Sequence, residues 1–271
     1  ISRITKPIVW TLHDMWPFVG CEHYIDSQSS NSYSSILSML RLLPIYILSR
    51  LTWLRKYLFW SHKKNIIYIA PSHYIASLAR SSTLLSKRPI QVIPNCIDTN
   101  LWKPKDKYEA RLLFGLRQDM PTLIFTAYSG TSDKRKGFDL LASSLESYSR
   151  SYSAEPLQLL VIGCSSLDST YDLGANLVKY IPYTETQAEL CQLYSCGDLL
   201  VIPSRIDNLP NTALESLACG LPVAAFSVGG IPEIITSLST GYLATPYCVD
   251  YLAFGINYLI SRRYDTDISI K

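Results

Sequence analysis

Acidic residues are absent from the long stretch between Asp26 and Asp98 in this chain of 271 residues. Nine basic residues fall in the same stretch: Arg41, Arg50, Arg55, Lys56, Lys63, Lys64, Arg80, Lys87 and Arg88. A segment that carries charge of one sign attracts anionic partners such as lipid headgroups, phosphates or acidic glycans. We expect a partner of this kind rather than a nucleic acid.

The sequence also lacks any Cys-X-X-Cys pair and any visible signal peptide. We therefore expect reduced thiols in a cytoplasmic protein, several of them buried as small apolar residues. The chain begins at Ile1 rather than at Met, so we interpret it as a piece of a longer protein. The cysteines are odd in number and show no repeated spacing: Cys21, Cys96, Cys164, Cys191, Cys196, Cys219 and Cys248.

Charged residues are scarce, at 17% of the chain, while hydrophobic residues make up 48%. This composition supports packed cores and argues against extended disorder. The length suits one large domain or two smaller ones.

No clean membrane span is present, although residues 36–60 are dense in Leu, Ile, Tyr and Trp. Pro44 and the basic residues Arg41, Arg50 and Arg55 interrupt this stretch too often for a spanning helix. One interpretation is a helical segment that lies in the membrane interface, with peripheral contact through 36–64 at the inner face of the membrane. The other is a pair of core-facing helices with a solvated basic side.

Strand-like runs alternate with helical patterns over most of the chain, which predicts an α/β fold with doubly wound parallel sheets. The pattern predicts a partial N-terminal domain over 1–100 and a more complete C-terminal domain over 101–271, joined by a linker at 101–108. Expected strands are 7–12, 65–70, 89–93, 122–128, 157–163, 177–181, 198–203, 222–226 and 241–244. Expected helices include 72–80, 109–116, 137–152, 185–196, 210–218, 231–236 and 251–262.

The segment Ser204–Gly220 follows a buried strand, opens a polar loop and then starts a helix near Pro210. Unpaired N–H groups and the helix dipole make such a helix start an anion site. Two carboxylates bracket it, Asp207 in the loop and Glu215 inside the helix. An anion site between two acids suits a ligand with both phosphates and hydroxyls, such as a nucleotide-sugar.

Three further segments are candidates for the ligand edge of the sheets. The basic residues of Asp133–Phe138 precede a glycine at a helix start. We expect them either to bind a diphosphate or to form a solvated run of charges. Cations at that end oppose the helix dipole, so we expect other groups to compensate them. Gly229–Glu233 is either a flexible ligand loop or a simple turn. His13 follows the first strand and is either a ligand contact or an ordinary histidine.

These segments together resemble the retaining glycosyltransferases of the GT-B fold known as family 4, with the "glycosyl transferases group 1" domain on the C-terminal side. Within the family the chain looks most similar to the exopolysaccharide or lipopolysaccharide branch. The resemblance covers nearly the whole chain, from Lys6 to about Ile260. It rests on Lys6–Trp16 (KPIVWTLHDMW), Ala70–Ser82 (APSHYIASLARSS), Val92–Asp98 (VIPNCID), Ser132–Leu141 (SDKRKGFDLL), Asp198–Pro222 and Val228–Ile234 (VGGIPEI).

The resemblance implies a role for each matching residue. Glu215 would bind the ribose hydroxyls and Asp207 the transferred sugar, with one methylene less than the usual glutamate. Lys136 would neutralise the leaving diphosphate, and His13 would reach the donor sugar. Arg135 is a candidate for an arginine that the family carries after the first strand of this domain, where Tyr128-Ser129-Gly130 stands here. Further donor contacts are expected from Asn208, Leu209, Pro210, Asn211 and Thr212.

The implied activity is transfer of a sugar, with retention, from a UDP- or GDP-linked donor to a glycan or lipid-linked acceptor. Neither metal nor cofactor is expected, since none of the candidate site segments contains a carboxylate–X–carboxylate pair that would bind a catalytic metal. The family's first strand, its glycine-rich loop and its cysteine-rich loop have no counterpart here, where Cys21 stands alone. The alternatives are therefore a non-catalytic nucleotide-sugar-binding fragment and, from another class, a sugar epimerase of the same architecture.

Overall fold

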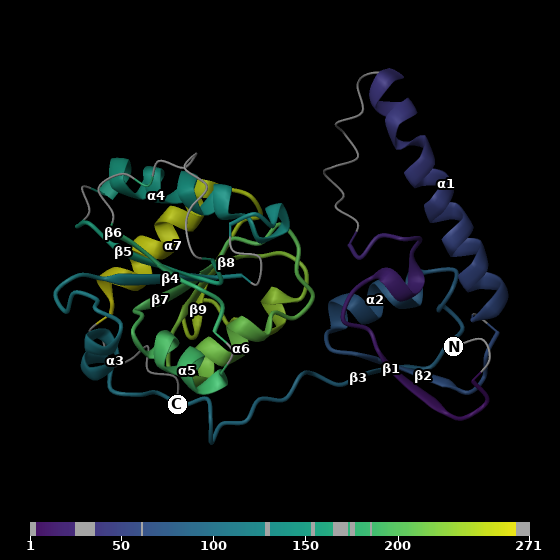
Figure 1. Cartoon of the computed structure of the whole chain (residues 1–271), viewed down its shortest axis with the longest axis horizontal. Coiled ribbons are helices and arrows are strands. Elements are labelled where there is room, and N and C mark those ends of the chain that lie inside the picture. The colour runs from purple at the N-terminus through teal and green to yellow at the C-terminus, as the bar shows by residue number, and fades with distance from the viewer. Residues whose placement is uncertain are drawn as a thin grey trace. The chain divides into compact units, whose positions relative to one another are not determined.

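The computed structural model describes residues 4–24, 36–60, 62–127, 131–152, 155–164, 173, 177–184 and 186–263, and of 36–43 only the backbone. The chain divides into two compact units, Ile1–Asn95 and Cys96–Lys271 (Figure 1). The expected α/β class is confirmed, because every strand pairing within the two sheets is parallel. The sequence placed the division after residue 100, whereas the structure divides the chain after Asn95.

The N-terminal unit has a three-stranded sheet of β1 (Ile8–Thr11), β2 (Ile66–Ala70) and β3 (Ile90–Val92), in that order. The three expected strands are thus confirmed. Helix α2 (His73–Ser81) follows β2, and the Ser72 side chain caps it by accepting a hydrogen bond from the Ile75 amide at 3.0 Å. Alternate residues of β2 point to opposite faces, so Tyr68 is buried while Ile67 is 44% exposed.

Residues 36–60 form one helix, α1 (Ile36–Phe59), and not the pair of core-facing helices that was one expectation. Pro44 lies inside it without splitting it. Lys56 is buried, and its ammonium donates hydrogen bonds to the carbonyl oxygens of Trp16 and Gly20, the second at 2.5 Å. One side of α1 therefore packs on the loop around the 3-10 turn η1 (Trp16–Phe18).

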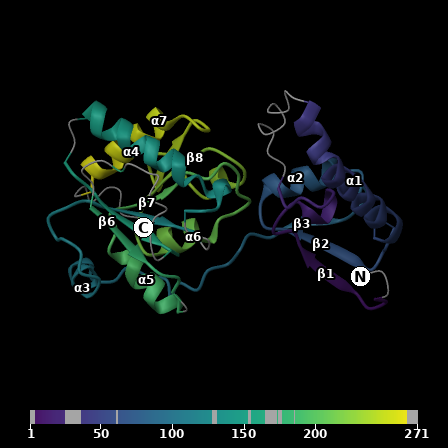
Figure 2. The same cartoon turned by 45° about the horizontal axis from the view of Figure 1, so that its top comes forward.

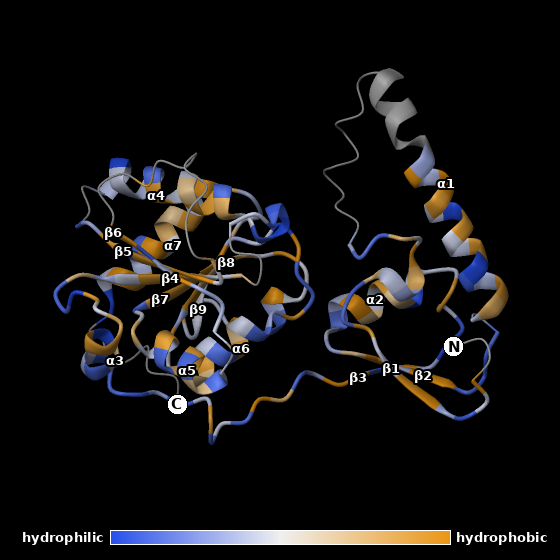
Figure 3. Ribbon diagram, in the orientation of Figure 1, coloured by the Kyte–Doolittle hydropathy of each residue, from blue (hydrophilic) through white to orange (hydrophobic). Residues whose placement is uncertain are grey.

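The opposite side of α1 exposes an apolar stripe. Its members are Ile47, Leu51, Leu54 and Leu58, between 46% and 59% exposed. Their spacing places them along one line of the helix, and the exposed Arg50 and Arg55 lie on either side of that line. Figure 3 shows hydrophobic and hydrophilic residues alternating along this part of α1. No helix in the described residues is long and apolar enough to cross a membrane.

The C-terminal unit contains a six-stranded parallel sheet in the order β6-β5-β4-β7-β8-β9. Numbered within the unit, this is the strand order 3-2-1-4-5-6 of Rossmann-like folds. The predicted strands are confirmed, 177–181 and 241–244 with the predicted bounds and the other four with slightly shorter ones. They are β4 (Thr122–Thr126), β5 (Gln158–Ile162), β6 (Leu177–Ile181), β7 (Leu199–Ile202), β8 (Val223–Phe226) and β9 (Gly241–Ala244).

Helices cover both faces of this sheet, α4 and α7 on one side and α5 and α6 on the other (Figures 1 and 2). Their bounds are α3 (Lys107–Leu113), α4 (Phe138–Tyr152), α5 (Gln187–Ser195), α6 (Asn211–Ala218) and α7 (Val249–Ser261), with 3-10 turns η3 (Lys134–Lys136) and η4 (Ile231–Glu233). The α-helix expected over 231–236 is therefore wrong, since only the short turn η4 forms there.

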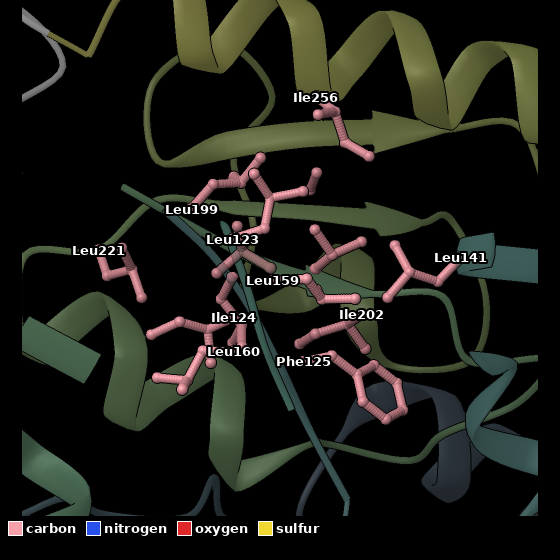
Figure 4. Packing of buried hydrophobic residues seen from close by; sticks show 14 of the residues in the cluster. Leu123, Ile124, Phe125, Leu141, Leu159, Leu160, Leu199, Ile202, Leu221 and Ile256 are labelled. Atoms are coloured by element: carbon pink, nitrogen blue, oxygen red, sulfur yellow. The ribbon is translucent and has the colours of Figure 1, made fainter. Parts of the chain in front are cut away.

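The core of the C-terminal unit is continuous from the sheet into both helix layers. Leu123, Ile124 and Leu160 of the central strands are fully buried, as are Leu141 and Ile256 from the helices that cover them (Figure 4). Trp102, in the expected linker, is 5% exposed and belongs to this core. The linker is thus partly an element of the C-terminal unit, because a buried tryptophan anchors it there.

Candidate functional site

The candidate site lies where the strand order of the large sheet reverses. Strands β4 and β7 are neighbours in the middle of the sheet, and their following connections run to opposite sides. Ligands of open α/β sheets bind at such a switch point, outside the carboxyl ends of the strands. Two segments with predicted site residues follow these two strands, Asp133–Gly137 after β4 and Pro203–Pro210 after β7.

The first segment is a short cationic turn held by its own acid. Asp133 caps η3 by accepting a hydrogen bond from the Arg135 amide at 2.9 Å, and its other oxygen lies 3.0 Å from the Arg135 guanidinium. Gly137 ends the turn with φ of +71°, and a Cβ there would lie 2.0 Å from the Pro203 carbonyl oxygen. Glycine is needed at this position because of both the conformation and the close approach of the second segment.

The two segments meet in a cation–carboxylate cluster. Lys136 Nζ lies 2.6 Å from Asp207 Oδ2, and Arg135 Nη1 lies 3.9 Å from the same oxygen. The Asp207 side chain is 9% exposed, so the pair is largely shielded from water. The structure thus brings together three of the predicted site residues. It also supplies the expected compensation for the cations at the start of α4, since Asp133 and Asp207 both neutralise them.

Arg205 clamps the two segments to each other. Its guanidinium binds both oxygens of Asp139 at 2.8 and 2.6 Å, and it also donates to the Lys134 carbonyl. Its amide donates to the Arg135 carbonyl at 2.8 Å. The hydrogen bond from Arg205 holds the pKa of Asp139 below its usual value. Sequence reasoning assigned no role to Arg205 or Asp139.

The segment around Gly229 and Gly230 contacts the backbone of Asp207. The Gly230 amide donates to the Asp207 carbonyl at 3.1 Å, and a Cβ on Gly229 would lie 1.8 Å from that oxygen. Gly229 has φ of +59°, a conformation that favours glycine. The structure therefore gives this segment a supporting role at the site, beyond that of a simple turn.

The second segment leads into α6, which starts at Asn211 after an extended Pro210. The N-cap residue Pro210 makes no capping side-chain hydrogen bond, and the helix start carries the positive end of the dipole, which favours an anion. Asn208, Leu209, Pro210, Asn211 and Thr212 make up this turn, as predicted for the donor contacts. Their contacts with a donor stay a prediction.

Glu215 lies one turn further along α6 and has a partner that the sequence did not indicate. The Tyr194 hydroxyl donates to Glu215 Oε2 at 3.1 Å, and Tyr194 is fully buried in α5. Burial raises the pKa of the Glu215 carboxyl above its usual value, and the hydrogen bond from Tyr194 partly opposes this. The pairing joins side chains 21 residues apart on two successive helices, a separation at which no local spacing rule indicates a contact.

His13 lies in the N-terminal unit, just beyond the carboxyl end of β1. Its backbone carbonyl accepts a hydrogen bond from the Tyr24 hydroxyl at 3.3 Å. The next residue, Asp14, binds the His23 ring at 2.5 Å and accepts from the Trp16 amide at 2.9 Å. Because the two units are described separately, the approach of His13 to the donor stays a prediction. Tyr128, Ser129 and Gly130 lie outside the described residues.

Among the described residues, no group of three His, Cys, Asp or Glu side chains could hold a metal ion. Ser204 lies immediately before Arg205. Among the described residues, its Oγ is the buried side-chain oxygen or nitrogen atom without a hydrogen-bond partner.

The chain combines a Rossmann-like unit, which carries a cluster of cations and a carboxylate at its switch point, with a smaller α/β unit. Two family models match the chain in the same division, "Glycosyltransferase Family 4" over residues 2–101 and "Glycosyl transferases group 1" over 121–262. The chain therefore belongs to the group 1 family of glycosyltransferases. This confirms the GT-B fold class that the motifs predicted.

Among curated relatives, the chain is similar to the D-inositol 3-phosphate glycosyltransferase of Mycobacteroides abscessus. The identity is 30% over 185 residues, which cover 64% of this chain and 40% of the relative. The enzyme of the same name from Segniliparus rotundus is 32% identical over 165 residues, covering 57% of this chain and 35% of the relative. The chain thus matches well under half the length of these proteins.

Among solved structures, the chain is similar to HepE from Anabaena in complex with UDP-glucose, with a TM-score of 0.64 and 20% identity. That match covers 97% of this chain and 64% of the other. It is also similar to WaaG, a glycosyltransferase involved in lipopolysaccharide biosynthesis, with a TM-score of 0.67, 18% identity, and coverage of 95% and 67%. At these identities the likeness describes the fold.

Proposed function

We propose that the protein transfers a sugar, with retention, from a nucleotide-sugar donor to a hydroxyl of its acceptor. The observation that carries this proposal is the cluster at the switch point, where Lys136 lies 2.6 Å from Asp207 beside the start of α6. The family membership and the UDP-glucose complex of HepE support a nucleotide-sugar as the donor.

The cluster suits the charge that develops when a sugar leaves a diphosphate. Lys136 and Arg135 supply fixed positive charge, and the start of α6 adds oriented backbone dipoles, so the leaving diphosphate is stabilised without reorganisation. Asp207 faces the same space and contacts the hydroxyls of the transferred sugar. The acceptor hydroxyl then attacks from the face that the diphosphate leaves and gives its proton to the departing diphosphate oxygen, so the configuration is retained.

The nucleotide half of the site is tested by binding. Glu215→Gln removes the charge that accepts hydrogen bonds from the ribose, and we expect UDP or GDP affinity to fall at least about tenfold. Isothermal titration calorimetry measures the affinity, and circular dichroism checks that the fold is intact. Unchanged affinity for both nucleotides would refute the ribose role of Glu215.

The catalytic half is tested by turnover. A panel of UDP- and GDP-sugars is incubated with the protein, and mass spectrometry detects transfer to a glycan acceptor, a lipid-linked acceptor and D-inositol 3-phosphate. The last acceptor is included because of the names of the curated relatives, whereas WaaG favours a cell-surface polysaccharide. Nuclear magnetic resonance of the product gives its anomeric configuration. Nucleotide binding with no turnover for any donor would favour the non-catalytic alternative.

We further propose that α1 places the protein on an anionic membrane surface from the cytoplasmic side. The stripe of Ile47, Leu51, Leu54 and Leu58 is exposed, and Arg50 and Arg55 flank it, so the apolar residues enter the interface while the guanidiniums reach the headgroups. The absence of acidic residues between Asp26 and Asp98 favours an anionic surface over a neutral one.

Flotation with liposomes tests this contact. We expect the protein to float with vesicles that contain phosphatidylglycerol and to stay behind with phosphatidylcholine alone. Leu51→Gln with Leu58→Gln should abolish flotation, whereas Leu112→Gln with Leu113→Gln, two exposed leucines of α3, should leave it unchanged. Flotation that is insensitive to the stripe or to anionic lipid would contradict the proposal.

A further inference from the structure

The carboxylate of Glu215 is held from one side only. Tyr194 donates to its Oε2 at 3.1 Å, and among the described residues Oε1 has no protein hydrogen-bond partner. Glu215 itself is half-buried. One oxygen is thus hydrogen-bonded to a side chain of the core, whereas the other has no such partner among the described residues.

Tyr194 is itself fixed in place. It is fully buried in α5, and its ring lies 6.0 Å from the buried Trp102 ring. Burial and the nearby Glu215 charge raise the pKa of Tyr194 well above its usual value, so the phenol keeps its proton and donates it. A donor with no freedom to move selects one orientation of the carboxylate.

We propose that Tyr194 is a positioning residue that orients Glu215, so that the free oxygen of the carboxylate accepts hydrogen bonds from the ribose of the nucleotide. This inference rests on the proposed role of Glu215 in ribose binding. It adds a residue from α5, a helix that contributes none of the expected donor contacts.

Apart from Tyr194, the titratable groups in the neighbourhood of Glu215 are, among the described residues, two thiols and one ammonium. The thiols of Cys191 in α5 and Cys219 at the end of α6 lie 3.6 Å apart, and burial raises the pKa of Cys219. Lys105 is the nearby cation, acting on Cys219. Strands β7 and β8, which pack on α6, carry no charged residue.

Tyr194→Phe removes the hydroxyl and keeps the ring, and the nucleotide, UDP or GDP, is compared with its 2′-deoxy form by calorimetry. We expect the affinity for the ribonucleotide to fall about three- to tenfold. The preference for ribose over deoxyribose should fall by a similar factor. Because the carboxylate loses a stabilising donor, the pH at which affinity drops on acidification should also move upward. Tyr148→Phe, a buried tyrosine of α4, is the matched control and should behave as the wild type.

The outcomes separate this inference from the proposed function. If Glu215→Gln leaves nucleotide affinity unchanged, the ribose role of Glu215 fails and the inference with it. If Glu215→Gln weakens binding but Tyr194→Phe changes neither the ribose preference nor the pH at which affinity drops on acidification, only the positioning role is overturned. An equal loss for ribo- and deoxyribonucleotides in Tyr194→Phe would mean a structural role and would also overturn it.

Discussion

Two buried serines near the site differ in whether their hydroxyl groups make a hydrogen bond. Ser216 in α6 donates to the Leu221 carbonyl at 2.9 Å, whereas Ser204 Oγ has no partner among the described residues. We expect Ser204→Ala to leave the free energy of unfolding nearly unchanged, because no hydrogen bond is lost. Ser216→Ala should lower it by about 1 kcal/mol.

Urea denaturation of the two serine variants measures this contrast, and both substitutions remove one oxygen from a buried position. A loss for Ser204→Ala as large as that for Ser216→Ala would contradict the expectation. Such a result would mean that the Ser204 hydroxyl bonds a group in solution.

Single residues of the site were predictable only where they belong to a pattern that is local in the sequence. Lys136 and Asp207 each follow a strand, and the parallel topology brings the ends of neighbouring strands to one edge. Arg205–Asp139 and Tyr194–Glu215 were not predictable, because each joins side chains from distant segments with no spacing that signals it. The long-range partner of a polar residue depends on packing angles that a sequence pattern does not contain.

Among the elements, the strands of both sheets were predictable because buried parallel strands are short apolar runs between loops. The form of residues 36–60 was not, since the sequence is compatible both with an interfacial helical segment and with a pair of core-facing helices. The structure accommodates Pro44 inside one helix, and Lys56 ties that helix to the loop before it. The alternative of core-facing helices places the basic residues on a solvated side, whereas Lys56 is buried.

The loop between β1 and α1 depends on Lys56. Lys56→Met removes the donor for the carbonyl oxygens of Trp16, Val19 and Gly20, so these groups lose their partner inside the protein. We expect faster hydrogen exchange of the loop amides in residues 15–20. Lys64→Met, an exposed lysine beyond the end of α1, is the control and should leave exchange unchanged.

The same lysine gives a pH signature. Burial lowers the pKa of Lys56 from 10.5 to about 8, so between these values the folded state binds fewer protons than the unfolded state. The free energy of unfolding contributed by Lys56 therefore rises as the pH increases above 8. The stability difference between the wild type and Lys56→Met should grow in that direction from pH 8 to 10. A difference that shrinks with rising pH would contradict the burial of the ammonium.

At the scale of the whole molecule, the two units differ in how completely they bury their sheets. The described part of the N-terminal unit exposes Val9 and Ile67, which are register partners on one face of its sheet. The C-terminal unit buries both faces of its four central strands, β5, β4, β7 and β8, and its core extends to Trp102. Parallel sheets need cover on both faces, so the C-terminal unit contains what is needed to fold alone.

We therefore expect residues 96–271 to unfold cooperatively by themselves and to retain the nucleotide affinity of the whole chain. The segment before α3 matters for this, because Trp102 packs near Tyr194 and the Cys191 thiol contacts the Leu101 and Lys103 carbonyl oxygens. Residues 109–271, or 96–271 with Trp102→Ala, should be less stable by about 3–5 kcal/mol. Thermal unfolding and calorimetry with UDP and GDP measure both properties. Noncooperative unfolding of 96–271 would mean that its core depends on the N-terminal unit, and equal stability of the shorter fragment would mean that Trp102 is no part of the core.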